Sequence, residues 1–159
     1  MQLRRFLFQL ILLFSASLFV SSCEQSRVFD KNIPLEKEGW FYGEAKLFEV
    51  EILDTAIAYN MYVNIRHTDE YPYNNIWLKL NTTLPDGTTQ ENKINVELSM
   101  LTGEWTGNCI DGICYTTVLV QHNFALQQKG KYVFSLEQDM RMNPIPYVLD
   151  VGIKVEKFI

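Results

Sequence analysis

The sequence has little of what most active sites are built from. It contains two histidines, His67 and His122, and three cysteines among 159 residues. It has no G-x-S-x-G, no H-E-x-x-H and no glycine-rich phosphate loop, the short motifs of many hydrolases, metalloproteases and nucleotide-binding enzymes. His67 stands beside acidic residues at the end of an alternating segment, where a solvated side chain is expected. We therefore predict that the protein is not an enzyme and has no cofactor, no metal site and no small-molecule substrate.

Basic residues are also scarce. Fourteen Lys and Arg stand against 19 Asp and Glu, which gives a net charge of −5. Nucleic-acid binding rewards clustered Lys and Arg, because much of its affinity comes from the phosphate backbone. An acidic chain is not drawn to an anionic lipid surface by charge either. We expect no nucleic-acid partner, and membrane attachment has to rest on something other than charge.

One long hydrophobic run is present, at the N-terminus. Arg4 and Arg5 precede the mostly apolar residues 6–20, and two serines and Cys23 follow. A membrane-spanning helix needs about 20 apolar residues, and this run has 15. The arrangement of charge, apolar run and small residues predicts an export signal over residues 1–22.

The end of this signal, residues 20–23 (VSSC), resembles the lipobox of bacterial lipoproteins. In a lipobox the cysteine thiolate takes up diacylglycerol before cleavage, so the cysteine is required. The alternative is a plain export signal with a chance cysteine. A processed lipoprotein carries more than one acyl chain, which stable anchoring requires. The resemblance predicts lipid on Cys23 and attachment to a membrane through that lipid.

Cys109 and Cys114 are the other two cysteines, and a turn separates them. Export exposes them to an oxidising compartment, where pairing is the rule. Asp111-Gly112 between them predicts a two-residue type I′ hairpin turn, which places the cysteines opposite each other at the closer kind of cross-strand position. A disulfide there closes a short loop and contributes about 2 kcal/mol. A metal site needs three or four ligands, and the histidines have no spacing relation to the pair, so we predict a disulfide.

The mature chain divides into a tether and one domain. Residues 23–38 are polar and charged, with Pro34 among them, and predict a flexible, lipid-anchored tether. From Gly39 and Trp40 onward apolar and polar residues alternate with a period of two, and no segment keeps a 3.6-residue period. Residues 123–129 have room for one helical turn at most. The alternating segments are residues 46–53, 57–67, 76–81, 94–99, 114–122, 130–136 and 147–158.

About seven or eight antiparallel strands separated by turns predict an all-β domain over residues 39–159. A β-sandwich, jelly-roll-like in its connections, fits this number of short strands. Trp77 lies on the polar face of its strand and fits either a solvent-facing platform or a core ring. Trp105, in a glycine-flanked loop, is expected nearer the surface. Exposed Trp side chains serve protein contacts or stack on sugars.

Several strings of the mature chain resemble the gliding-motility lipoprotein family GldH of the Bacteroidota. The resemblance runs from residue 28 to residue 156, and the lipobox agrees with it. Cys109 and Cys114 are not part of the family pattern. The strings are Y-N-x-x-x-x-I-R (59–66), Y-P-Y-x-N-x-W-L (71–78), G-x-W-x-G (103–107), Q-x-M-R (138–141) and D-x-G-I (150–153).

The resemblance implies an envelope protein that supports gliding motility and the associated type IX secretion apparatus. Its partners would be envelope proteins of that machinery, and it brings no catalytic or ligand-binding residues. The short segment after Cys23 is less acidic than the surface-export signal of this phylum. We therefore expect a lipid-anchored protein on the periplasmic side of the outer membrane.

A lipoprotein without catalytic equipment acts by contact, and large aromatic and arginine side chains are the usual anchors of such contacts. The alternative is a surface glycan-binding β-sandwich module, because exposed aromatic rings also stack on sugars. The candidate interaction surface consists of Tyr71, Tyr73, Trp77, Trp105, Arg66 and Arg141.

Lipid attachment can be tested by metabolic labelling. A palmitate analogue should label the wild-type protein, and Cys23→Ala should remove the label because the substituted chain has no acceptor thiol. Equal labelling of the two proteins, or no label on the wild type, would contradict the lipobox prediction.

Overall fold

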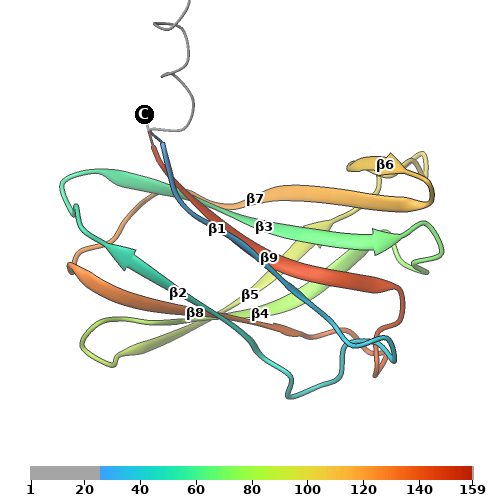
Figure 1. Cartoon of the computed structure of the whole chain (residues 1–159), viewed down its shortest axis with the longest axis horizontal. Helices are drawn as coiled ribbons and strands as arrows, with labels where there is room; N and C mark the ends of the chain where they lie inside the picture. Colours follow the sequence, from blue (N-terminus) through green and yellow to red (C-terminus); the bar gives the residue numbers. More distant parts are fainter. Residues whose placement is uncertain (1–25, 159) are drawn as a thin grey trace, which may run out of the picture.

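The computed structural model describes residues 26–158. In that range it contains nine β-strands in two antiparallel sheets that pack face to face (Figure 1), and no helix long and apolar enough to cross a membrane. The predicted all-β sandwich is confirmed. The strands are β1 (Arg27–Pro34), β2 (Lys46–Ile52), β3 (Ala58–Thr68), β4 (Asn75–Thr83), β5 (Thr89–Glu97), β6 (Asn108–Ile110), β7 (Ile113–Ala125), β8 (Gly130–Gln138) and β9 (Val148–Lys157).

The strands pair as one long hairpin rolled onto itself. β1 pairs with β9, β2 with β8, β3 with β7 and β4 with β5, all antiparallel. Further pairing of β3 with β9 and of β4 with β8 completes the sheet orders β1-β9-β3-β7-β6 and β2-β8-β4-β5. With the short β6 set aside, this is the nested order of an eight-stranded jelly roll.

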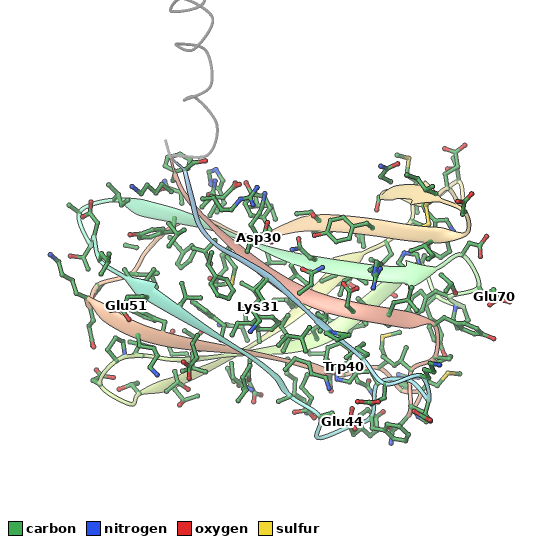
Figure 2. The ribbon with its side chains drawn as sticks, in the orientation of Figure 1. Asp30, Lys31, Trp40, Glu44, Glu51 and Glu70 are labelled. Carbon is green, nitrogen blue, oxygen red and sulfur yellow. A yellow bond between two sulfur atoms is a disulfide. The ribbon has the colours of Figure 1, made fainter. Side chains whose placement is uncertain are left out.

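Alternation along each strand decides which side chains enter the core. In β4, Ile76, Leu78 and Leu80 are fully buried between the sheets, whereas Trp77 faces out. Trp40 precedes β2 and is fully buried as well; its indole N–H donates to the Glu44 carbonyl at 2.8 Å (Figure 2). The largest fully buried side chains are Trp40, Tyr59, Tyr132, Phe48 and Phe134.

Residues 27–34 form a strand, so the prediction of a flexible tether over residues 23–38 is wrong for this part. β1 pairs with β9 from Arg27 opposite Glu156 to Pro34 opposite Asp150, and the ring of Phe29 packs edge-on against a core phenylalanine. Its residues are no more than half-buried because β1 is an edge strand. An edge strand tolerates charges and proline, which hid it in the sequence. Cys23 lies outside the described residues.

Two strand limits also differ from the prediction. β5 begins at Thr89, before the expected start at residue 94. The sequence pattern missed these first residues because they are exposed on both faces of the strand and show no alternation. β7 continues to Ala125, so residues 123–125 are strand and not part of a helical turn.

The β6–β7 hairpin carries the disulfide. Asp111 and Gly112 both have positive φ, 50° and 76°, as a type I′ turn requires. Cys109 and Cys114 face each other across the hairpin, joined by a disulfide with a Cα–Cα distance of 4.0 Å.

The two ends of the sandwich differ. At the chain-entry end, β1 begins and β9 finishes, and the Lys157 N–H donates to the Ser26 carbonyl at 2.7 Å. At the opposite end, here called the loop end, lie the turn of the β6–β7 hairpin and the connections 35–45, 69–74, 98–107 and 139–147 (Figure 1). Glu51 marks the first end and Glu70 the second in Figure 2.

The role of β1 can be tested by shortening the chain. A variant that begins at residue 35 loses the half-buried Val28, Phe29 and Ile33, so it should unfold at lower denaturant with a loss of about 3 kcal/mol. A variant that begins at residue 26 should keep full stability. Equal unfolding midpoints for the two would restore the tether interpretation.

Candidate functional site

A groove of about 340 Å³ opens on the outer face of the four-stranded sheet, towards the loop end. Tyr73, Trp77 and Arg141 come together in it, so the structure unites three of the six predicted contact residues. Trp77 is 37% exposed, which settles its open assignment in favour of the surface. The full lining is Tyr73, Trp77, Lys93, Asp139, Met140 and Arg141.

Charged side chains in this groove form ion pairs with one another. Asp139 forms ion pairs with Lys93 and, at 3.8 Å, with Lys79. The hydrogen bond from Lys93 lowers the pKa of Asp139, so the carboxylate stays charged at neutral pH. The Lys93 ammonium also lies 5.4 Å from the Trp77 ring centroid, within reach of a cation–π contact. Sequence reasoning did not single out Lys93 and Asp139, because nothing local shows that β5 and the segment after β8 flank the same tryptophan.

Methionine sulfur forms part of the groove wall. The backbone N–H of Trp77 donates to the Met140 sulfur at 3.2 Å, and the Tyr73 hydroxyl lies 3.8 Å from the Met142 sulfur. Methionine is flexible and polarisable and adapts to different partners. An aromatic, methionine and arginine surface is typical of protein interfaces. Among residues 26–158 no group of His, Cys, Asp or Glu is arranged to hold a metal ion.

Tyr71 does not belong to this surface, and its prediction as a contact residue is wrong. It is buried, its hydroxyl donates to the Asn75 carbonyl at 3.1 Å, and its ring packs edge-on against Tyr73. Burial raises the pKa of the Tyr71 hydroxyl far above its ordinary value. The turn after β3, held by the Tyr71 N–H to the Thr68 carbonyl at 3.1 Å, folds this side chain inward.

His67 is fully buried, so the prediction of a solvated strand-end histidine is wrong. On β3 it faces the core, and the loop after β5 covers it with the half-buried Trp105, whose ring centroid lies 4.6 Å away. His67 Nδ1 hydrogen bonds with the Thr68 carbonyl at 2.7 Å. Burial lowers the pKa of His67 despite this bond, which keeps the ring neutral. Trp105 therefore serves chiefly as a cover for the core.

Arg66 lies on the outer face of the other sheet, away from the groove. Its Nε donates to Asp150, whose second carboxylate oxygen accepts from the Asn32 amide at 2.8 Å. Asn64, almost fully buried, donates to Asn32 at 3.0 Å and accepts from Thr117 at 2.9 Å. This polar network joins β1, β9, β3 and β7, so Arg66 is first a structural residue, although its side chain stays partly exposed.

The loop end also exposes apolar side chains that the sequence analysis missed. Leu101 is fully exposed, and Met100 beside it is more than half exposed. The only signal in the sequence is an apolar pair placed directly before the Thr102-Gly103 turn. Clustered exposed apolar side chains on a small domain mark interaction sites. The exposed apolar residues of the loop end are Phe41, Tyr42, Met100, Leu101, Ile110, Ile113, Met142 and Tyr147.

These features define a jelly-roll domain that presents an aromatic groove and apolar loops at one end. Comparison with known proteins agrees with the resemblance in the sequence. The family model described as GldH lipoprotein matches residues 27–155, and the chain belongs to this family.

Two named relatives span almost the whole chain. The chain is 27% identical over 154 residues to the "Gliding motility lipoprotein GldH homolog" of Christiangramia forsetii, covering 92% of this chain and 93% of the relative. It is 26% identical over 153 residues to the "Gliding motility lipoprotein GldH" of Flavobacterium johnsoniae, covering 92% and 94%.

The buried histidine predicts a pH-dependent stability. The unfolded chain takes up a proton on His67 near the ordinary pKa of 6.5, whereas the folded protein keeps the ring neutral. The unfolded state therefore binds more protons as the pH falls, and the free energy of unfolding should decrease from pH 7.5 to pH 5.5. His67→Phe, which keeps a ring against Trp105, should flatten this slope in denaturant titrations. Equal slopes for the two proteins would contradict the assignment.

Proposed function

We propose that this chain is a lipid-anchored envelope protein that supports gliding motility and the associated type IX secretion apparatus. It acts by contact with other envelope proteins and not by catalysis. Its relatives named gliding motility lipoproteins align with it over more than nine-tenths of both chains, which supports a shared role. We expect lipid on Cys23 to anchor it to the outer membrane, and the weakly acidic segment after Cys23 favours the periplasmic side.

The placement of exposed apolar residues carries this proposal. Eight of the large exposed apolar side chains gather at the loop end, and the described chain begins at the opposite end with β1 (Figure 1). A lipid three residues before Ser26 holds the chain-entry end at the membrane, so the loop end faces away from it. Apolar surface directed away from a membrane fits a protein partner in the periplasm.

The groove supplies anchors of the kind that dominate binding energy. Trp77 and Tyr73 are large rings of limited flexibility, and Arg141 is exposed beside them. Residues of these types are enriched among interface positions whose truncation costs most. Trp77→Ala or Arg141→Ala should each weaken partner binding by about tenfold or more, while unfolding in denaturant stays close to wild type.

Cross-linking in living cells can test the orientation. A photo-reactive amino acid at Leu101 should give adducts with envelope proteins, and the same group at Leu53 should not. The two leucines are both well exposed, but Leu53 follows β2 at the chain-entry end. In a gliding host, Leu101→Glu should reduce colony spreading at unchanged protein level, and Leu53→Glu should not. Adducts from Leu53 alone, or equal effects of the two substitutions, would sink the proposal.

A further inference from the structure

A second pocket lies between the two sheets, at the chain-entry end and away from the groove. Its volume is about 390 Å³, within the range of about 300–1,000 Å³ that ligand pockets occupy. β5 is an edge strand of the four-stranded sheet and contacts β7 of the other sheet. The pocket opens between these two strands. None of the residues assigned above to the groove or the loop end lines it.

Polar side chains occupy the inward positions of β5 at this pocket. Val96 is buried and Ile94 is partly buried on the inner face of the strand. The next inward positions are Asn92, opposite Leu80, and Gln90, opposite Thr82. Both residues are exposed at this open edge of the sandwich, so their amides are accessible to a ligand.

β7 and the turn after it add three more amides. A break in the register of β7 places Gln121 opposite the buried Met61, and Gln127 and Gln128 follow in the turn that leads to β8. An amide offers two N–H donors and one acceptor oxygen. Among the described residues, the side chains of Gln121 and Gln127 make no hydrogen bond, and the same holds for Gln90 and Asn92. Four amides therefore keep their hydrogen-bonding capacity for a ligand.

Aromatic rings complete the lining, and no charged side chain belongs to it. Phe124, on the β7 side, is only partly buried, whereas Tyr132 and Phe134 are almost fully buried core residues whose rings stack with an interplanar angle of 13° and centroids 6.3 Å apart. In a chain with 21% charged residues, a neutral lining of twelve residues selects against phosphates, carboxylates and other ionic ligands.

The rim of the pocket is already fixed in place. The Tyr132 hydroxyl donates to the Gln128 carbonyl at 3.1 Å, and the Gln128 N–H donates to the same hydroxyl at 3.2 Å. The Gln128 side-chain amide donates to Asp86 at 2.7 Å, which braces this turn against the turn after β4. That bond and those from Thr88 lower the pKa of Asp86, so the brace persists at neutral pH. A preformed pocket binds with less loss of conformational freedom.

We propose that this amide pocket, built from Gln90, Asn92, Gln121, Gln127 and the ring of Phe124, binds a neutral saccharide. A sugar presents hydroxyl groups that both donate and accept, which matches free amides, and an apolar C–H face, which matches the partly buried Phe124 ring. Its lack of charge matches the lining. The site is independent of the protein contacts proposed above, and it differs from a platform on Trp77 because it lies at the other end of the domain.

Isothermal titration calorimetry can test the pocket with the mature lipoprotein in micelles of a zwitterionic detergent that has no sugar headgroup. The probes are neutral oligosaccharides of glucose, mannose, galactose, xylose and N-acetylglucosamine. At least one should bind, and Asn92→Leu combined with Gln121→Leu should weaken it about tenfold or more, since two hydrogen bonds are lost. Glucuronic acid oligomers, which carry charge, should bind more weakly than the neutral oligomer of the same length.

Asn95→Leu is the matched control, because Asn95 lies on the same strand with its side chain on the outer face, hydrogen bonded to Asn75 at 2.6 Å. It should leave the affinity unchanged. Asn92→Leu alone, at an exposed position, provides a milder variant if the double substitution lowers the unfolding midpoint. The proposal is overturned if no neutral oligosaccharide binds, or if binding is lost in Asn95→Leu and Trp77→Ala while both amide-pocket variants keep it.

Discussion

The burial of one face of every strand between two sheets is the constraint on which this structure depends. A strand can place only every second side chain in the core, so the chain has to repeat apolar residues with a period of two in each strand. β4 shows the rule in its simplest form, with Ile76, Leu78 and Leu80 inside and Trp77 outside. The groove follows directly from this rule, because the pleat that buries the three aliphatic residues necessarily presents the tryptophan to solvent beside Lys93.

The same rule explains how far the sequence predicts the fold. Strands with strong alternation, the all-β class and the cysteine hairpin could be read from local pattern alone. β1 could not, because an edge strand with half-buried residues carries a weak pattern and depends on β9, more than 110 residues later, for its pairing. Long-range pairing also decides which side chains meet. The grouping of Trp77, Lys93 and Asp139 therefore needed the structure, and so did the burial of His67 under Trp105.

Most of the sequence strings that resemble the family are explained by the fold and not by a binding site. A side chain at Gly152 would collide with Asn32, and one at Gly107 would collide with Thr116, because strands pass too closely there. Gln138 is fully buried, and its side-chain Oε1 accepts from the backbone N–H of Met140 at 2.9 Å, which shapes the segment leading to the groove. Arg141 from the same string is exposed in the groove, so one short string contributes both a buried structural residue and an exposed side chain of the groove.

The positions where the inward pattern fails are as informative as those where it holds. His67 breaks it with a polar ring that burial keeps neutral, and aromatic neighbours cover it completely. Gln90 and Asn92 break it at the opposite end, where no side chain covers them and a pocket opens instead. A polar residue in the inward register of a strand is therefore accommodated in two ways here, by burial under other side chains or by exposure to solvent. Only the second leaves hydrogen-bonding groups available. The domain accordingly exposes apolar side chains at the loop end and has a neutral pocket lined by amides at the chain-entry end. Because the sandwich separates the two ends, the proposed partner contact and the proposed saccharide binding would not compete for the same surface.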